Sequence, residues 1–184
     1  MLRGIKNPET IAAHTFRMTI MAWILCCHKN LDLNKVLKMS LIHDICEVFS
    51  GDTTPYDKIL PKDKKQWKKV LDKWPRLSQK EKNKFFISKY RKEYQGLQKI
   101  ISNLPKNFKK EIKDLWNDYE NGLTGEGRFV RQLDRIENLL QALEYWEKGE
   151  KFSIYPWWVQ IEELIDDPTL FKFMKILEKK FHKK

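Results

Sequence analysis

Apolar residues recur at helical spacing along almost the whole chain, and this periodicity limits the fold more than any other feature of the sequence. It is clearest over residues 107–120 and 124–148, and it returns over 157–165 and 169–181. The chain has only 7 glycines in 184 residues, and we find no alternating apolar and polar segment of the kind that marks a half-buried strand. The sequence therefore predicts an all-α fold, and its length suits one domain with a sizeable core.

The first third of the chain predicts two amphipathic helices followed by a loop. Thr10 is the expected N-cap of a helix that continues through Asn30. The residues predicted on the apolar side of this helix are Ile11, Phe16, Ile20, Ile24 and Leu25. A second helix is predicted over 34–49 and ends before Gly51. The segment GDTTPYDKILP is predicted to be a loop, because one glycine and two prolines interrupt it.

Residues 62–92 are strongly charged and contain two amphipathic stretches that Pro75 separates. This pattern predicts a helical hairpin that lies over the core, as an insertion into a single domain covering 1–184. Aromatic residues at helical spacing in this segment are more typical of a packing surface than of a base-stacking site. They are Trp67, Trp74, Phe85, Phe86 and Tyr90.

The chain is strongly basic, with 36 Lys and Arg residues against 25 Asp and Glu residues and a formal net charge of +11. Such a balance favours anionic partners, namely nucleotides, nucleic acid or an anionic membrane surface. A solvated lysine-rich surface explains the same composition. The charge alone therefore does not identify a partner.

The three cysteines indicate a reducing compartment. Cys26, Cys27 and Cys46 lie within apolar helical patterns and show no paired metal-ligand spacing, as expected of free thiols in the cytoplasm. No apolar run approaches the roughly 20 residues of a membrane span, and the N-terminus lacks the basic segment and apolar core of a signal peptide. We therefore expect a cytoplasmic protein without a membrane partner.

Three polar residues interrupt the apolar segment LIHDICEVF, which begins at Leu41. Glu47 lies four residues after His43 and three after Asp44, so a continuous helix would place the three side chains on one face. Desolvating a carboxylate costs several kcal/mol unless a cation compensates. Imidazole and carboxylate groups together suit a divalent transition metal. The segment therefore predicts a metal site, which requires further ligands.

His14 and Asp134 are the other candidate ligands, since each lies within an amphipathic helical pattern. Taken alone, His14 is more often a hydrogen-bonded core residue. Asp134 taken alone is more often an ion-paired carboxylate, with Arg131 and Arg135 as the nearby cations. Considered together, His14, the pair His43 and Asp44, and Asp134 form an ordered set that is more specific than any of its members.

This ordered set resembles the H…HD…D pattern of the HD-domain superfamily of metal-dependent phosphohydrolases. The sequence segments around these residues strengthen the resemblance. They are PETIAAHTFRM around His14, LIHDICEVFSGDTTPYD around His43, LWNDYE from Leu115, and RFVRQLDRIENLLQALEYW around Asp134. They are similar to the branch that hydrolyses deoxynucleoside 5′-monophosphates. The resemblance implies a single HD-domain helical bundle and a homodimer.

The resemblance also implies one divalent metal ion, held by His14, His43, Asp44 and Asp134. The ion would be Co, Mn, Mg, Ni, Fe or Zn, and a water bound to it would attack the 5′-phosphate of a nucleoside monophosphate. Helical geometry and the family pattern together favour Glu47 as the group that orients this water or transfers a proton, assisted by Asp52. The alternative is that Glu47 pairs with Arg17 and that Asp52 only caps the loop.

Residues near the ligands in sequence are candidates for binding the substrate phosphate. Cationic and hydroxyl donors are the groups that a phosphate requires. Those predicted here are Arg17, Thr53, Thr54 and Lys58. A solvated surface role is the alternative for each of them.

Two other classes of function remain open. An HD phosphohydrolase could act on nucleoside triphosphates or on another phosphoester, which the identity of the released product would reveal. A non-catalytic HD scaffold that binds nucleic acid through lysines of the segment 62–69 would explain the charge. It would leave the acidic, histidine-containing face without a role.

Overall fold

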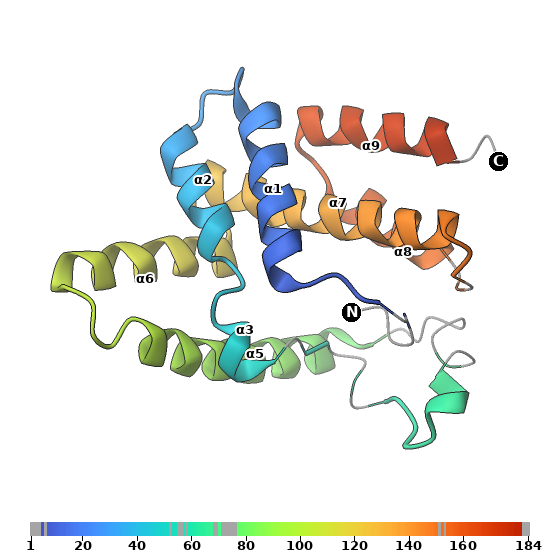
Figure 1. Ribbon diagram of the computed structural model, residues 1–184, viewed down its shortest axis with the longest axis horizontal. Coiled ribbons are helices and arrows are strands. Elements are labelled where there is room, and N and C mark those ends of the chain that lie inside the picture. Colours follow the sequence, from blue (N-terminus) through green and yellow to red (C-terminus); the bar gives the residue numbers. More distant parts are fainter. Residues whose placement is uncertain are drawn as a thin grey trace.

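The structure is a computed structural model, and it describes residues 5, 7–51, 53–54, 57, 59–67, 70, 77–150, 152 and 154–181. Every regular element within these residues is helical, which confirms the all-α prediction (Figure 1). The elements are α1 (Ile11–Cys26), α2 (Leu33–Ile42), α3 (Glu47–Ser50), η2 (Lys64–Gln66), α5 (Gln79–Ile100), α6 (Lys106–Asn121), α7 (Gly125–Glu147), α8 (Tyr155–Leu164) and α9 (Pro168–Phe181). In this part of the chain no helix is both long and apolar enough to cross a membrane.

Helix α7 is the centre of the larger core, and α1, α2, α6, α8 and α9 pack against it (Figure 1). It begins at the N-cap Thr124, whose hydroxyl accepts a hydrogen bond from the amide of Gly127. Its buried apolar positions follow helical spacing, for example Val130, Leu133 and Ile136. They pack against apolar residues from the surrounding helices, so the larger core is built around α7.

A glycine allows α6 and α7 to approach closely where the chain turns between them. Asp118 of α6 accepts hydrogen bonds from the amide and the hydroxyl of Thr124, at 2.9 and 2.6 Å. It also lies 2.7 Å from Lys35 Nζ of α2. A Cβ atom at Gly127 would lie only 2.2 Å from Asp118 Oδ1 and 2.7 Å from its carbonyl oxygen. The close contact between α6 and α7 therefore requires glycine at position 127.

The substitution Gly127→Ala is expected to lower the free energy of unfolding by about 3 kcal/mol, because the new methyl group must displace Asp118 and its hydrogen bonds. Urea unfolding measures the change. Gly125→Ala is the matched control, since its Cβ would meet only the end of the flexible Leu31 side chain, at 3.0 Å. An equal effect of the two substitutions would contradict this account.

The predicted apolar side of the first helix is wrong except at Leu25, which packs against the larger core. Thr10 does cap α1, but the helix ends at Cys26, and its buried residues are His14, Met18, Ala22 and Cys26. Phe16 is 70% exposed and Ile24 63% exposed. The buried side has the smaller and less uniformly apolar residues because α1 packs closely on α2 and α7 there, and because the same side carries His14. Hydrophobicity alone therefore selected the opposite face.

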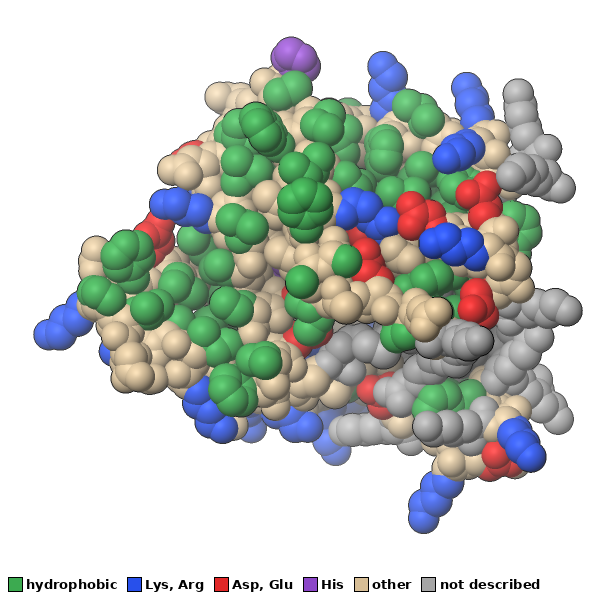
Figure 2. Space-filling model, in the orientation of Figure 1, with side chains coloured by type: hydrophobic (Ala, Val, Ile, Leu, Met, Phe, Trp, Pro, Cys, Tyr) green, Lys and Arg blue, Asp and Glu red, His purple; other side chains and the backbone are tan. Residues whose placement is uncertain are grey.

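Exposed apolar side chains occur both on α1 and in the segment 41–49. Figure 2 shows hydrophobic side chains gathered over α1, α2 and α3. We call this surface the outer apolar face, and its members are Phe16, Ile20, Trp23, Ile24, Leu41, Ile45, Val48 and Phe49. Contiguous apolar surface of this kind on a folded protein marks an interaction site more often than chance exposure.

The continuous helix predicted over 34–49 is also wrong, because it is interrupted at residues 43–46. Helix α2 ends at Ile42 and α3 begins at Glu47. Between them the backbone tightens to i→i+3 hydrogen bonds, from Ile45 to Ile42 at 3.1 Å and from Glu47 to Asp44 at 3.0 Å. Helix α3 ends before Gly51, as predicted, where φ is 68°. The break occurs at the His-Asp pair.

Helix α5 passes beside this break and shares a smaller core with it. This core contains Cys46, Leu97, Ile101 and Trp116. Gly96 permits the contact, since a Cβ there would lie 2.9 Å from the carbonyl oxygen of Cys46. Helix α5 is the second arm of the predicted hairpin, and the predicted insertion boundary near residue 92 falls inside it. Much of the first arm lies outside the described residues, and the single-domain assignment stays a prediction.

Candidate metal centre

The fold brings together the four residues predicted as metal ligands. His14 comes from the first turn of α1, His43 and Asp44 from the turn that follows α2, and Asp134 from the middle of α7. The two imidazole Nε2 atoms lie 3.1 Å apart. His43 Nε2 lies 3.2 Å from Asp44 Oδ2, and His14 Nε2 lies 3.3 Å from Asp134 Oδ1. Helices separated by up to 120 residues of sequence thus direct nitrogen and carboxylate oxygen atoms to one place.

Hydrogen bonds on the far side of each imidazole ring determine which nitrogen faces the centre. His43 Nδ1 donates to the carbonyl oxygen of Ser40 at 2.8 Å, and His14 Nδ1 donates to the carboxylate of Glu137. In the neutral form each ring then presents an unprotonated Nε2 to the centre. Two facing lone pairs repel each other, and a cation between them removes this repulsion. The donor set fits a divalent metal ion, and three of its members, His14, His43 and Asp44, lie mutually close enough to share one.

Asp134, the carboxylate that α7 contributes, is held in place by two further side chains. Tyr119 donates its hydroxyl to Asp134 Oδ2 at 3.0 Å, and Asn138 donates to Asp134 Oδ1 at 2.8 Å. The ring of Tyr119 also meets the ring of His43 edge-on, with centroids 5.1 Å apart. Tyr119 lies in the segment LWNDYE, whose resemblance to the family did not assign it a role. It orients one predicted ligand and packs against another.

The electrostatics of the centre favour a cation. Burial on its own lowers the pKa of His14, but the carboxylates of Asp134 and Glu137 raise it to about 11. Burial on its own raises the pKa of Asp134, but hydrogen bonding to His14 and the charges of both histidines hold it well below its ordinary value. The negative potential that holds a proton on His14 also attracts a metal ion, so proton and metal compete for Nε2.

Metal binding to this centre is expected to release protons and to strengthen as the pH rises from 6 to 9. In the metal-free protein the raised pKa keeps His14 protonated over this range, and the ion must displace that proton. For one displaced proton, the apparent affinity should rise about tenfold per pH unit. Isothermal titration calorimetry in buffers of different ionisation enthalpy measures both quantities. An affinity that does not change with pH, with no proton released, would contradict the assignment of His14.

Glu137 is a residue of the candidate site that the sequence patterns did not single out. Its carboxylate is completely buried, and it binds two cationic groups, His14 on one side and Arg17 on the other. It lies three residues after Asp134 on α7, so both carboxylates share one side of that helix. This spacing, applied to a carboxylate among the apolar residues Ile136 and Leu139, is the signal that could have identified it.

Arg17 has a structural role at this centre. Its guanidinium donates to Glu137 at 2.6 Å, Gln141 at 2.7 Å and Glu144 at 2.8 Å. A further ion pair joins it to Glu9 at 3.5 Å. These contacts neutralise the buried carboxylate that orients His14. Binding of the substrate phosphate by Arg17 stays a prediction, and it would require the guanidinium to exchange at least one of these partners.

The remaining predicted site residues lie in or near the loop after α3. Glu47 is the first residue of α3 and is half-buried. Thr53 is half-buried as well, and Thr54 donates through its amide and its hydroxyl to the carboxylate of Asp57, both at 3.0 Å. Asp52 and Lys58 lie outside the described residues. The predicted roles of all five residues stay predictions.

Helices that direct two imidazoles and two carboxylates to one point define a class, the helical metal-binding domains with a paired His-Asp motif. The sequence match to the family described as "HD domain" covers residues 1–156. The chain belongs to this family, as the resemblance of its motifs indicated.

Several curated relatives are named 5′-deoxynucleotidases. The chain is 32% identical over 145 residues to the 5′-deoxynucleotidase HDDC2 of Xenopus laevis, covering 79% of this chain and 59% of that protein. It is 31% identical over 143 residues to the human protein of the same name, covering 78% and 57%. It is 33% identical over 145 residues to the 5′-deoxynucleotidase YGK1 of Saccharomyces cerevisiae, covering 79% and 57%. The chain thus spans less than two thirds of the length of these relatives.

Solved structures share the fold. A protein of Magnetospirillum magnetotacticum, described as a predicted metal-dependent phosphohydrolase, superposes with a TM-score of 0.55 at 25% identity, over 78% of this chain and 61% of that one. A conserved hypothetical protein of Pyrococcus furiosus superposes with a TM-score of 0.63 at 23% identity, over 96% and 87%. The second likeness shows the fold alone.

Proposed function

We propose that the protein is a metal-dependent phosphomonoesterase that removes the 5′-phosphate from (deoxy)nucleoside monophosphates. The observation that carries the proposal is the convergence of His14, His43, Asp44 and Asp134, with both Nε2 atoms turned to the centre by Glu137 and Ser40. The curated relatives named 5′-deoxynucleotidases support the reaction and the substrate class.

The four converging residues would hold one divalent ion, for which imidazole and carboxylate ligands suit Mn, Fe, Co, Ni or Zn, while Mg is a further candidate. When bound, such an ion supplies Lewis-acid activation of water and neutralises charge on the phosphoryl group. Glu47, near these ligands in sequence, accepts the proton of the attacking water and passes it to the leaving 5′-oxygen, and Asp52 assists. The P–O bond to the 5′-oxygen breaks, so the products are a nucleoside and inorganic phosphate.

The experiment that tests this proposal measures phosphate release from a panel of nucleoside monophosphates. Metal-stripped protein receives Mn, Co, Mg, Ni, Fe or Zn singly, and we expect at least one metal to restore release from deoxynucleotides. Release of pyrophosphate or triphosphate from nucleoside triphosphates would instead favour the second phosphohydrolase class. Salt-dependent nucleic-acid binding without any turnover, unaffected by loss of His43, would favour the non-catalytic scaffold.

We also propose that the protein forms a homodimer through the outer apolar face. The side chains of this face, on α1 and in residues 41–49, are all exposed. The most exposed is Val48, at 71%. A two-fold axis would place this face of one copy against the same face of another, burying both. Sedimentation should give a dimer that Phe16→Glu converts to a monomer. Leu123→Glu, at an exposed position outside the face, is the control. A monomeric wild-type protein at tens of micromolar would overturn the proposal.

We propose the cytoplasm as the compartment of this protein. Cys26, Cys27 and Cys46 are all free thiols, which is the state that a reducing compartment maintains. Fractionation of the source cells should place the protein with cytoplasmic markers, and recovery from a secreted fraction would contradict this.

A further inference from the structure

Helix α5, which packs against α3 and meets Cys46, carries a half-buried lysine to which no role in the site has been given. Lys89 Nζ lies 2.6 Å from Glu93 Oε1, one helical turn further along α5. The Glu93 side chain is only 2% exposed and that of Lys89 only 25%. Burying an ammonium and a carboxylate carries a desolvation penalty that their attraction offsets only when the geometry is good. A pair held in this way fixes the position of the ammonium.

Carboxylates from three parts of the fold stabilise the charge of this ammonium. Burial on its own lowers the pKa of Lys89, but Glu93 raises it above its ordinary value, and Glu120 of α6 and Asp44 contribute in the same direction. The ammonium therefore stays charged at every physiological pH. Asp44 is one of the four converging ligands, so the charge of Lys89 acts at the edge of the metal centre.

A phosphate dianion entering the centre needs a cation beyond the metal ion, since carboxylates dominate the site. The guanidinium of Arg17 is already bound by Glu137, Gln141 and Glu144. The hydroxyl of Thr54 is bound by Asp57. Among the described residues, Lys89 is a half-buried cation whose charge interacts with Asp44 and that a partner on its own helix holds in position.

We propose that Lys89 supplies the positive charge that binds the phosphate of the substrate at the metal centre, with Glu93 as its positioning residue. The inference deepens the proposed function and rests on it. It assigns the phosphate contact to α5, the helix that packs against α3 and meets Cys46. An ammonium suits this task as a compact point charge with three donors, of which Glu93 engages one.

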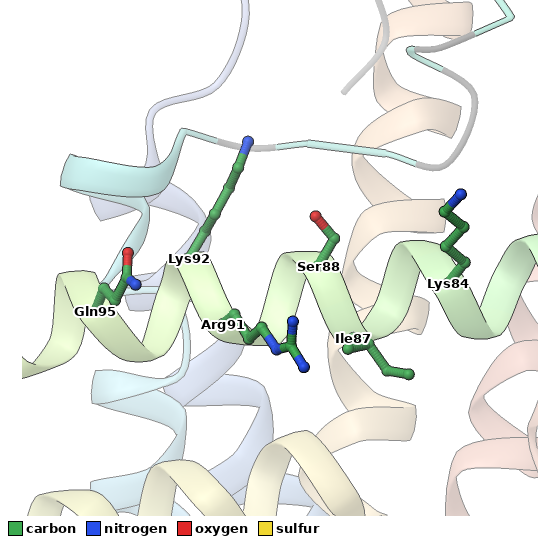
Figure 3. A pocket seen from close by; sticks show the side chains of 6 residues that line it. All are labelled: Lys84, Ile87, Ser88, Arg91, Lys92 and Gln95. Atoms are coloured by element: carbon green, nitrogen blue, oxygen red, sulfur yellow. The ribbon is translucent and has the colours of Figure 1, made fainter.

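The outer surface of α5 offers a rival site for an anion. Figure 3 shows the side chains that line a pocket there, which we call the outer groove: Lys84, Ile87, Ser88, Arg91, Lys92 and Gln95. Lys92 is exposed in this groove and lies three residues after Lys89. It matches Lys89 in charge, side-chain length and helix, so it provides the control variant.

The test uses the full chain loaded with Mn²⁺ and measures binding of inorganic phosphate by calorimetry, together with its inhibition constant against nucleotide hydrolysis. Lys89→Met leaves Glu93 buried without its cation and can unfold, so the double variant Lys89→Met with Glu93→Gln removes both charges. We expect phosphate binding to weaken about tenfold to a hundredfold in both variants. KM for the nucleotide should rise similarly, Mn²⁺ affinity should be retained, and Lys92→Met should match the wild type.

Three results would overturn the inference. Normal phosphate affinity in the double variant would show that Lys89 only neutralises Glu93. Loss of Mn²⁺ affinity in that variant would show that the pair acts through the metal ligands. Weaker phosphate binding in Lys92→Met alone would move the anion site to the outer groove. The proposed function fails separately: Lys89-dependent phosphate binding without hydrolysis of any nucleotide would remove the reaction and leave the anion site in place.

Discussion

Replacing Asp44 with Ala is expected to abolish both metal binding and phosphate release, whereas replacing Glu47 with Gln is expected to keep the metal and lose the turnover. Asp44 Oδ2 lies 3.2 Å from His43 Nε2, so its removal takes a donor atom out of the centre. We expect metal affinity to fall by more than the 10–100-fold typical of losing an orienting partner. The Glu47 change removes only a proton acceptor and should lower kcat by about 10²–10⁴-fold. Metal titration beside steady-state kinetics separates the two effects.

Glu163→Gln is the control for the Glu47 change, because Glu163 is an exposed carboxylate of α8. His28→Ala similarly controls for the loss of a histidine, since His28 is exposed after α1. Both controls should match the wild type in metal affinity and in kcat. Full activity in either Asp44→Ala or Glu47→Gln would contradict the proposed mechanism.

The second large effect is expected at Glu137, which links His14 to Arg17. Replacing it with Leu leaves the Arg17 guanidinium partly buried without its central partner and removes the acceptor of His14 Nδ1. Breaking a buried ion pair from one side costs about 3–5 kcal/mol of unfolding free energy. The freed imidazole should also bind metal about 10–100-fold more weakly. Urea unfolding of the metal-free protein and metal titration measure the two losses.

A double variant separates the two roles of Glu137. Glu137→Leu combined with Arg17→Met removes both charges, so most of the lost stability should return, as a double-mutant cycle would record. Metal affinity should stay low, because nothing then orients the His14 ring. A single Glu137→Leu variant whose unfolding free energy lies within about 1 kcal/mol of the wild type would contradict the ion-pair argument. Recovery of metal affinity in the double variant would contradict the orienting role.

The helices were predictable from local sequence because each satisfies its own periodicity and caps. Thr10 and Thr124 cap α1 and α7 through their hydroxyl groups, and short polar side chains before an apolar run predict this. The buried side of α1 was not predictable in the same way. Its large apolar residues face outward, and the choice of face depends on close packing against α2 and α7, which α1 alone does not specify.

The candidate ligands were predictable because polar residues at apolar positions of a helix are costly without a partner. The break at residues 43–46 was not, since an unbroken helical pattern continues through it. Glu137 could have been found by applying the same reasoning one turn beyond Asp134. Lys89 could not, because only the packing of α5 against α3 lets its charge interact with Asp44. Proximity between helices distant in sequence is information that spacing does not contain.

Asp134 and Glu137 are carried by a single turn of α7, the helix against which most of the larger core is packed. One of these carboxylates touches His14 at Nε2 and the other at Nδ1. A slip of α7 by one residue, about 1.5 Å along its axis and 100° around it, would therefore detach both contacts together. Metal affinity should therefore report on how α7 is packed in the core. A substitution among the buried apolar residues of α7 that shifts the helix would lower metal affinity, although it lies far from any ligand.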